Sequence, residues 1–251
     1  MSTQHIAVVT GAGRGIGRAL TLAFAHSGYK VLALVRAPDA VDALKQDAPD
    51  IEAVAFDALD EASVLEACAT VQRAGIPRVL VNNAGVALSA SLAKTSTDDF
   101  DRTLTVNVRT PFLLCRELMP AMVKNGGGRV INIASTAAMK GYKYTSAYCA
   151  SKHALLGLTR SLAVEYAAKG VTVNAVCPGW TDTDMLAQSA QNISKATGRS
   201  VDAAREALAQ MNPMNRLTRA EDVAQLCLFL ASEAASTVTG AAWAMDGGES
   251  A

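Results

Sequence analysis

Short apolar runs recur along the chain, and helical stretches rich in alanine and leucine lie between them. The runs are continuously apolar and do not alternate with polar positions, which is typical of strands covered by helices on both faces. Strands that alternate with amphipathic helices form βαβ units and a parallel sheet. The pattern therefore predicts a doubly wound parallel α/β fold with helices on both faces. Its strands are expected at Ile6–Val9, Val31–Val35, Ile51–Phe56, Val79–Val81, Val130–Ile133 and Val171–Val176.

One domain is expected over residues 1–251. No linker rich in proline, serine or glycine divides the 251 residues, and neither a charge block nor a repeat interrupts them. A chain of this length can bury one large core. The least regular stretch runs from Asp184 to Arg216. Because long excursions in compact domains tend to carry function, residues 184–216 are predicted to be a helical lid or substrate loop.

The overall charge and the length of the apolar runs exclude several classes of partner. Lysine plus arginine number 23 and aspartate plus glutamate number 23, so the formal net charge is zero. No basic stripe is available to neutralise nucleic-acid phosphates. Every apolar run is shorter than the ~18 residues of a membrane span. No basic segment precedes the apolar run at Ile6, unlike a signal peptide. We expect no nucleic-acid partner and no membrane partner.

Cysteine and histidine usage argues against disulfides and metals. The cysteines are odd in number and show no CxxC spacing, and the histidines have no cysteine or histidine at ligand spacing. The thiols are expected to be small buried hydrophobes in a reducing compartment, so the cytoplasm is the predicted location and no metal site is predicted. These residues are Cys68, Cys115, Cys149, Cys177 and Cys227, with His5, His26 and His153.

A glycine-rich segment connects the first predicted strand to the following helix. It runs from Thr10 to Gly17, and Gly11, Gly15 and Gly17 set its register. Glycines at a strand-to-helix turn let the backbone approach a pyrophosphate, while the helix N-terminus supplies free N–H groups and the positive end of a dipole. Taken alone, this segment also fits a glycine-rich turn without a ligand, or the similar loop of a methyltransferase.

Further motifs follow the glycine loop in a fixed order. They are Asn82-Asn83-Ala84-Gly85, Asn107, Ser135, the run from Tyr148 to Lys152, Pro178-Gly179 and Asp246-Gly247-Gly248. In this order, and over nearly the whole chain, the motifs resemble the short-chain dehydrogenase/reductase family, with 3-ketoacyl thioester reductases as the nearest type. The resemblance implies a Rossmann-like dinucleotide-binding fold and leaves little room for a methyltransferase.

The end of the second predicted strand bears on the choice of cofactor. Rossmann enzymes that use NAD place an acidic residue there to hold the ribose 2′-hydroxyl, whereas this chain has Val35 followed by Arg36. Arg36 can pair with a 2′-phosphate, and Arg14 in the glycine loop resembles a second basic residue of NADP enzymes. Both arginines also fit ordinary solvated charges. We expect NADP(H), with NAD(H) as the alternative.

The resemblance also implies the remaining cofactor contacts. Asp57, after the third strand, corresponds to the residue that hydrogen-bonds the adenine amino group. Asn82 and Asn83 also fit turn chemistry that stabilises the sheet. The expected cofactor-binding residues are Gly11, Arg14, Gly15, Ile16 and Gly17 at the phosphates, Arg36 and Asp57 at the adenosine, Asn83, Ala84 and Gly85 at the ribose, Tyr148 and Lys152 near the nicotinamide, and Pro178, Gly179, Thr181 and Thr183 over it.

Tyr148 and Lys152 are four residues apart in a helical stretch, so they project from one helical face. Nearby positive charge lowers the pKa of a phenol, which is ordinarily about 10. The resemblance implies that Tyr148 is the general acid and base, that Ser135 hydrogen-bonds the carbonyl oxygen, and that Lys152 lowers the pKa of Tyr148 and holds the nicotinamide ribose. Asn107 would retain a water that links Lys152 to solvent.

These observations predict an oxidoreductase that uses NADP(H) to interconvert a small-molecule ketone and a secondary alcohol, with a 3-ketoacyl thioester among the possible substrates. One alternative is NAD-dependent oxidation of a cyclic or aromatic secondary alcohol, and another is a catalytically silent NADP-binding sensor. Tyr142 and Tyr144 fit either the substrate wall or a cover for the sheet edge. The resemblance further implies a homotetramer that pairs two long helices, at about Asp98–Lys124 and Ala147–Lys169.

Overall fold

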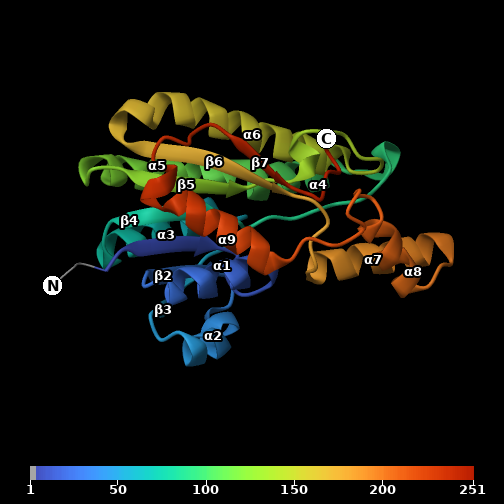
Figure 1. Cartoon of the computed structure of the whole chain (residues 1–251), viewed down its shortest axis with the longest axis horizontal. Helices are drawn as coiled ribbons and strands as arrows, with labels where there is room; N and C mark the ends of the chain where they lie inside the picture. The colour runs from blue at the N-terminus through green and yellow to red at the C-terminus, as the bar shows by residue number, and fades with distance from the viewer. Residues whose placement is uncertain (1–3) are drawn as a thin grey trace.

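The computed structural model describes residues 4–251. Seven strands form one sheet in the order β3-β2-β1-β4-β5-β6-β7, every neighbouring pair is parallel, and helices cover both faces (Figure 1). The predicted Rossmann-like doubly wound α/β fold is confirmed. The strands are β1 Ile6–Thr10, β2 Lys30–Val35, β3 Ile51–Ala55, β4 Pro77–Asn82, β5 Gly128–Ile133, β6 Val171–Pro178 and β7 Ala242–Met245.

The six predicted strands match β1 to β6 to within two residues at each end, whereas β7 is an addition. Its four residues are Ala-Trp-Ala-Met, and they pair with the carboxyl half of β6, where Pro178 is opposite Met245. A run this short, with no β-branched residue, lacks the signal that identified the other strands. The C-terminal segment therefore lies at the sheet edge, next to the end of β6.

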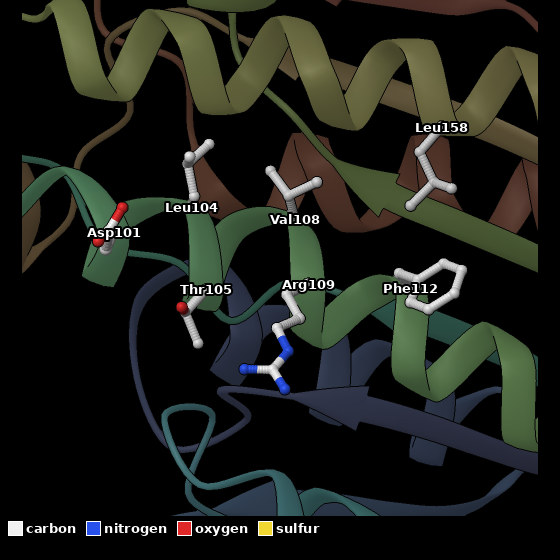
Figure 2. Close-up of a pocket in the computed structure, with 7 residues that line it drawn as sticks. All are labelled: Asp101, Leu104, Thr105, Val108, Arg109, Phe112 and Leu158. Atoms are coloured by element: carbon white, nitrogen blue, oxygen red, sulfur yellow. The ribbon is translucent and has the colours of Figure 1, made fainter.

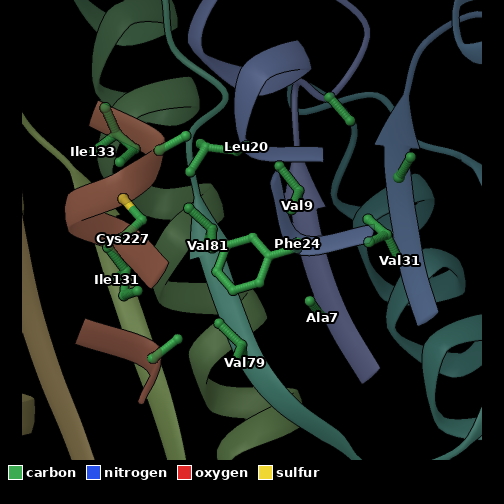
Figure 3. Close-up of a cluster of buried hydrophobic side chains, with 14 of the residues drawn as sticks. Ala7, Val9, Leu20, Phe24, Val31, Val79, Val81, Ile131, Ile133 and Cys227 are labelled. Carbon is green, nitrogen blue, oxygen red and sulfur yellow. The ribbon is translucent and has the colours of Figure 1, made fainter. Parts of the chain in front are cut away.

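Two apolar cores explain why the strands are apolar on both sides. Alternate residues of a strand point to opposite faces, and in β1 Val9 belongs to one core and Val8 to the other. On the first face, Leu20 and Phe24 of α1 pack over Val9 (Figure 3). The helices of this face are α1 Gly15–His26, α2 Asp42–Asp47 and α9 Ala220–Ala231, and those of the other are α3 Glu61–Ala74, α5 Thr110–Lys124 and α6 Ser146–Tyr166.

The helix predicted at Asp98–Lys124 is interrupted. It consists of α4 Thr97–Leu104, a π turn at Thr105–Arg109 and then α5. Pro111 has no N–H, so it cannot donate to the carbonyl of Asn107 four residues earlier. Such π turns recur at functional sites, and this one carries Asn107. The helix predicted at Ala147–Lys169 is α6, which ends in a short 3₁₀ turn at Ala167–Lys169.

The excursion at 184–216 is helical. It contains α7 Asp184–Thr197 and α8 Val201–Ala209, which pack together through Leu186, Ala190, Ala204 and Leu208. The N–H of Asp182 donates to the Thr218 carbonyl at 3.0 Å, and the N–H of Thr218 donates to the Trp180 carbonyl at 2.9 Å, so its two ends are joined. The pair of helices begins just after the carboxyl end of β6 and stands out from the sheet (Figure 1).

Within residues 4–251, none of the helices combines the length and the apolar character that crossing a bilayer requires.

Candidate active site

The motif residues meet at the carboxyl edge of the sheet. Gly11 follows β1, Asn83 follows β4, Ser135 comes two residues after β5, and Gly179 follows β6. In doubly wound sheets, ligands bind at this edge where the strand order reverses, which here is between β1 and β4. Segments that are far apart in the sequence therefore share one site.

The glycine loop has the geometry of a phosphate cradle. Gly11 and Gly15 have left-handed φ values of +64° and +50°, which favour glycine. A Cβ on Gly17 would lie 2.0 Å from the Gly11 carbonyl oxygen, so only glycine fits there. No side chain caps the N-terminus of α1, and its first turn has no acidic residue. The loop and the helix N-terminus therefore fit a dinucleotide pyrophosphate.

Thr10 and Asn83 join the glycine loop to the segment after β4. Thr10 Oγ1 accepts hydrogen bonds from the N–H groups of Asn83 and Ala84 at 2.9 and 2.8 Å, and Asn83 Nδ2 donates to the Thr10 carbonyl at 2.8 Å. Asn82 is buried and donates to Asn132 Oδ1 at 2.8 Å. Asn82 therefore stabilises the sheet, while Asn83 orders the loop at the site.

The residues predicted at the adenosine end lie on the surface. Val35 is buried at the end of β2, and Arg36 and Arg14 are exposed. Among residues 4–251, neither arginine takes part in an ion pair with an acidic side chain. Asp57 Oδ1 accepts from the N–H of Leu59 at 3.0 Å, which fixes the carboxylate at the turn after β3. Two cations beside an uncharged Val35 suit a 2′-phosphate.

Ser135, Tyr148 and Lys152 come together as predicted. Ser135 caps a short 3₁₀ turn, where its Oγ accepts from the Ala137 N–H at 3.1 Å, and its hydroxyl lies near enough to the Tyr148 phenol to lower the pKa of that phenol. The Nζ of Lys152 lies 5.7 Å from the centre of the Tyr148 ring and donates to the Ile133 carbonyl at 2.8 Å. A hydroxyl, a phenol and a buried ammonium thus share one end of α6.

Burial shifts the pKa values of Tyr148 and Lys152 in opposite directions. Burial raises the pKa of Tyr148, and the nearby Ser135 hydroxyl opposes that shift. Burial also lowers the pKa of Lys152 to about 8. The ammonium of Lys152 donates to the Ile133 carbonyl, and the role of Lys152 in lowering the pKa of Tyr148 stays a prediction. Burial therefore holds Tyr148 in its protonated form, ready to donate.

Asn107 clamps the site with its side chain. Its Oδ1 accepts from the Val86 N–H at 2.9 Å, and its Nδ2 donates to the Val86 carbonyl and to Ser151 Oγ, both at 2.9 Å. A Cβ on Gly85 would lie 3.3 Å from Asn107 Oδ1 and 3.6 Å from Lys152 Nζ. Asn107 therefore ties the loop after β4 to α6, a role that its place in the sequence did not indicate.

The segment predicted over the nicotinamide reaches the glycine loop. The N–H of Gly179 donates to the Met245 carbonyl at 3.0 Å, and Thr181 Oγ1 donates to the Gly179 carbonyl at 3.1 Å. Thr183 is the residue just before α7 and lies close to the loop, because its Cγ2 is 3.2 Å from where a Cβ on Gly15 would be. One short segment thus spans the distance from β6 to the phosphate cradle.

Comparison with known families agrees with this geometry. The family model described as enoyl-(acyl carrier protein) reductase matches residues 11–250. The chain belongs to the short-chain dehydrogenase/reductase family.

Named relatives of this short-chain dehydrogenase/reductase act on several substrates. The chain is 37% identical over 253 residues to 2-(R)-hydroxypropyl-CoM dehydrogenase of Xanthobacter autotrophicus, and the alignment covers 97% of this chain and 98% of that protein. It is 33% identical over 248 residues to a 3-oxoacyl-[acyl-carrier-protein] reductase of Thermotoga maritima, covering 97% and 96%. The actinorhodin polyketide ketoreductase, solved with NADPH, superposes with a TM-score of 0.94 at 29% identity and covers 100% and 99%.

Two tyrosines of this short-chain dehydrogenase/reductase take different positions. The hydroxyl of Tyr142 contacts Thr136 Oγ1 at 2.7 Å and Glu249 Oε1 at 2.6 Å. Tyr144 is 64% exposed with a left-handed φ of 65°, and its carbonyl accepts from the Ala90 N–H at 2.8 Å. Tyr142 therefore belongs to a polar cluster next to the segment that carries Ser135, whereas Tyr144 lies at the surface.

The sequence analysis did not identify Glu249 as part of this polar cluster, since a single polar residue near the end of the chain has no periodicity to reveal it.

The structure also bears on the predicted absence of metal sites and on the cysteines. Over residues 4–251, no group of three or more His, Cys, Asp or Glu side chains is placed to hold a metal ion. All five cysteines are free thiols, and four are buried. The cytoplasmic location stays a prediction.

Proposed function

We propose that this short-chain dehydrogenase/reductase uses NADP(H) to transfer a hydride between the nicotinamide and a ketone or secondary alcohol, with 3-ketoacyl thioesters as one substrate class. The observation that carries the proposal is the grouping of Ser135 beside Tyr148, with buried Lys152 one helical turn further along. The names of the 3-oxoacyl reductase and the polyketide ketoreductase support a carbonyl substrate.

In this mechanism the bound cofactor supplies the hydride, and the chain supplies the proton and the orientation. Tyr148 is kept protonated by burial, so it donates to the carbonyl oxygen as negative charge develops there. Ser135 hydrogen-bonds the same oxygen and its own hydroxyl is oriented by the Ala137 N–H. Lys152 holds the ribose, and Asn107 fixes the loop and helix on either side of it.

Arg36 is proposed to select NADP(H) by pairing with the 2′-phosphate. Arg36→Ala is expected to raise the Kd for NADPH about tenfold, as loss of one charge-assisted contact would, and to leave the Kd for NADH unchanged. Fluorescence titration of both nucleotides measures this. Arg73→Ala, which removes an exposed arginine on α3, is the matched control. If Arg36→Ala left the ratio of the two Kd values unchanged, Arg36 would not select NADP(H), and an NAD-dependent dehydrogenase would be the better interpretation.

The pH profile reports on Lys152. Its pKa of about 8 means that the ammonium loses its proton as the pH rises through that value. Because the proposed role needs the charged form, kcat/KM for reduction is expected to be level below about pH 8 and to fall above it. In Lys152→Arg the remaining activity should fall only at higher pH, since a guanidinium stays protonated. The same profile in both proteins would assign the titration to another group.

The substrate class is tested by NADPH oxidation with a panel of compounds. The panel contains cyclic and aromatic ketones, a 3-ketoacyl thioester and an enoyl thioester, the last because the matching family model is described as an enoyl reductase. We expect turnover with ketones, and we propose that the helical lid at 184–216 decides which ones. Turnover of the enoyl thioester alone would contradict the proposal. NADPH binding without any turnover would indicate a silent sensor.

The oligomer is proposed to be a homotetramer that pairs α5 and α6 with their copies. A hollow of about 430 Å³ lies on this face, and its apolar lining comes from α4, the π turn, α5 and α6, through Leu104, Val108, Phe112 and Leu158 (Figure 2). Phe112 on α5 is 44% exposed and Val164 on α6 is 85% exposed. Exposed apolar surface of this kind marks an interface. The exposed face of α6 also has small residues that allow close helix packing, namely Ala150, Ala154, Gly157 and Ser161.

Val164→Arg is expected to lower the mass of the assembly, because it puts a charge in the middle of the proposed interface. The change should leave the fold of each chain intact, since the side chain is exposed in the single chain. Light scattering after size-exclusion chromatography measures the mass. Val201→Arg, at an exposed position on α8, is the control and should keep the tetramer. A monomer for the wild-type protein would contradict this proposal.

A further inference from the structure

Glu249 is a buried carboxylate outside the family motifs. Its side chain is only 2% exposed, although it lies four residues after the end of β7, in the turn that follows this strand. The preceding Asp246 fixes this turn, because its carboxylate accepts from the N–H groups of Gly248 and Ser250 at 3.0 and 2.9 Å. The turn therefore delivers Glu249 to a defined place inside the protein.

One oxygen of Glu249 is bound to the segment that carries Ser135. Its Oε1 contacts the Tyr142 hydroxyl at 2.6 Å, and that hydroxyl contacts Thr136 Oγ1 at 2.7 Å. A phenol has one proton, and a carboxylate can only accept, so Tyr142 donates to Glu249 and accepts from Thr136. Burial and the carboxylate together raise the pKa of Tyr142. This chain of hydrogen bonds ends one residue from Ser135.

Lys140 completes the connection to the same segment. Its Nζ lies 3.3 Å from Glu249 Oε1 and donates to the Glu249 carbonyl at 2.7 Å. The ammonium therefore offsets the carboxylate charge and also holds the backbone of the C-terminal turn. Because Lys140 and Tyr142 both belong to the loop between Ser135 and α6, Glu249 is tied to this loop at two points.

The other oxygen of Glu249 lies against Gly179. A Cβ on Gly179 would lie 3.2 Å from Glu249 Oε2 and 3.1 Å from the Asp246 Cα, so the C-terminal turn packs directly on this glycine. Oε2 is buried, and among residues 4–251 no donor reaches it. A buried acceptor without a donor destabilises the fold. A side chain that only filled this space would need no charge.

We propose that Glu249 is a positioning residue that braces the Ser135 segment and the Gly179 turn against each other. This inference rests on the proposed function, in which Ser135 contacts the substrate and Gly179 covers the nicotinamide. A displacement of about 1 Å at either place is enough to slow catalysis strongly. Glu249 contacts both segments, so in this proposal it acts on catalysis through their positions.

The contact of Glu249 with Tyr142 and its contact with Gly179 predict different kinetic effects. Tyr142→Phe removes only the link to Thr136, so it is expected to lower kcat about tenfold and to leave the Kd for NADPH unchanged. Glu249→Ala removes both links, so it should lower kcat to a similar extent and also raise the Kd for NADPH about fivefold. Glu249→Gln keeps the shape without the charge and should fall between Glu249→Ala and the wild type. Steady-state kinetics and fluorescence titration measure the two quantities.

Glu66→Ala is the matched control, since it removes an exposed glutamate on α3 that pairs with Arg73 at 2.8 Å. It should leave both quantities unchanged. Wild-type kcat and NADPH affinity in a destabilised Glu249→Ala would show a purely structural role and overturn the proposal. If Glu249→Ala does not fold, unchanged kcat in both Glu249→Gln and Tyr142→Phe overturns it. If the wild-type protein reduces no ketone, the proposed function fails, whereas the NADPH affinity of Glu249→Ala still tests the brace.

Discussion

Tyr148→Phe is expected to reduce kcat for ketone reduction about a thousandfold, with NADPH bound at wild-type affinity. The substitution removes only the phenol O–H, which lies near the Ser135 hydroxyl and which burial keeps protonated. The ring itself stays in place near Lys152 Nζ, so packing is preserved. Steady-state NADPH oxidation gives kcat, and fluorescence titration of NADPH shows that the cofactor site is intact.

Tyr144→Phe is the matched control for this experiment. It removes the same O–H group from a tyrosine that is 64% exposed and lies four residues earlier. We expect its kcat to stay within about twofold of wild type, as for most surface substitutions. If Tyr148→Phe retained more than about a tenth of the wild-type kcat, another group would have to supply the proton and the proposed mechanism would be wrong.

Gly17→Ala is expected to abolish measurable NADPH binding. The added Cβ would lie 2.0 Å from the Gly11 carbonyl oxygen and 2.6 Å from Asn83 Nδ2. Neither the backbone of the loop nor the Asn83 side chain can move away without breaking the hydrogen bonds between Asn83 and the Thr10–Gly11 backbone. Overpacking of this kind also lowers the free energy of unfolding by about 1–3 kcal/mol. Titration with NADPH and thermal unfolding measure the two effects.

Gly13→Ala, in the same loop, separates this specific clash from general damage. Its Cβ would meet the Cβ of Ala40 at 3.0 Å and the Ala40 carbonyl oxygen at 3.3 Å, in the 3₁₀ turn Pro38–Val41, which is a much milder clash than the 2.0 Å contact at Gly17. Its NADPH affinity should therefore fall much less than that of Gly17→Ala. Equal losses in the two variants would contradict the assignment of Gly17 as the position where only glycine fits.

The sequence predicted the fold through the strands, because burial on both faces requires apolar residues at every position. Val8 and Val9 pack into different cores, and the run Ile6–Val9 signals that arrangement. β7 did not meet this condition, since Ala242–Met245 is short and only partly buried. The π turn was also not predicted, since it depends on how Pro111 interrupts hydrogen bonding that sequence periodicity does not report.

That Ser135, Tyr148 and Lys152 meet at one site could be predicted, because their order and spacing carry the signal. Tyr148 and Lys152 lie one helical turn apart, and Ser135 follows a strand that ends at the same edge of the sheet. The contacts of Asn107 with Val86 and Ser151 could not be predicted, nor could those of Glu249. They join residues from 21 to more than 100 positions apart, and only the folded chain determines which polar side chains meet.

The central claim, hydride transfer from NADPH to a carbonyl carbon, is tested most directly with NADPH deuterated at the transferable position of its nicotinamide ring. The protein is incubated with this cofactor and a ketone that it turns over, and the product is analysed by mass spectrometry. The account predicts an alcohol that carries one deuterium on the carbinol carbon for each NADPH oxidised. An alcohol without deuterium on that carbon, or deuterium found only on a carbon that had been part of a C=C bond, would contradict it.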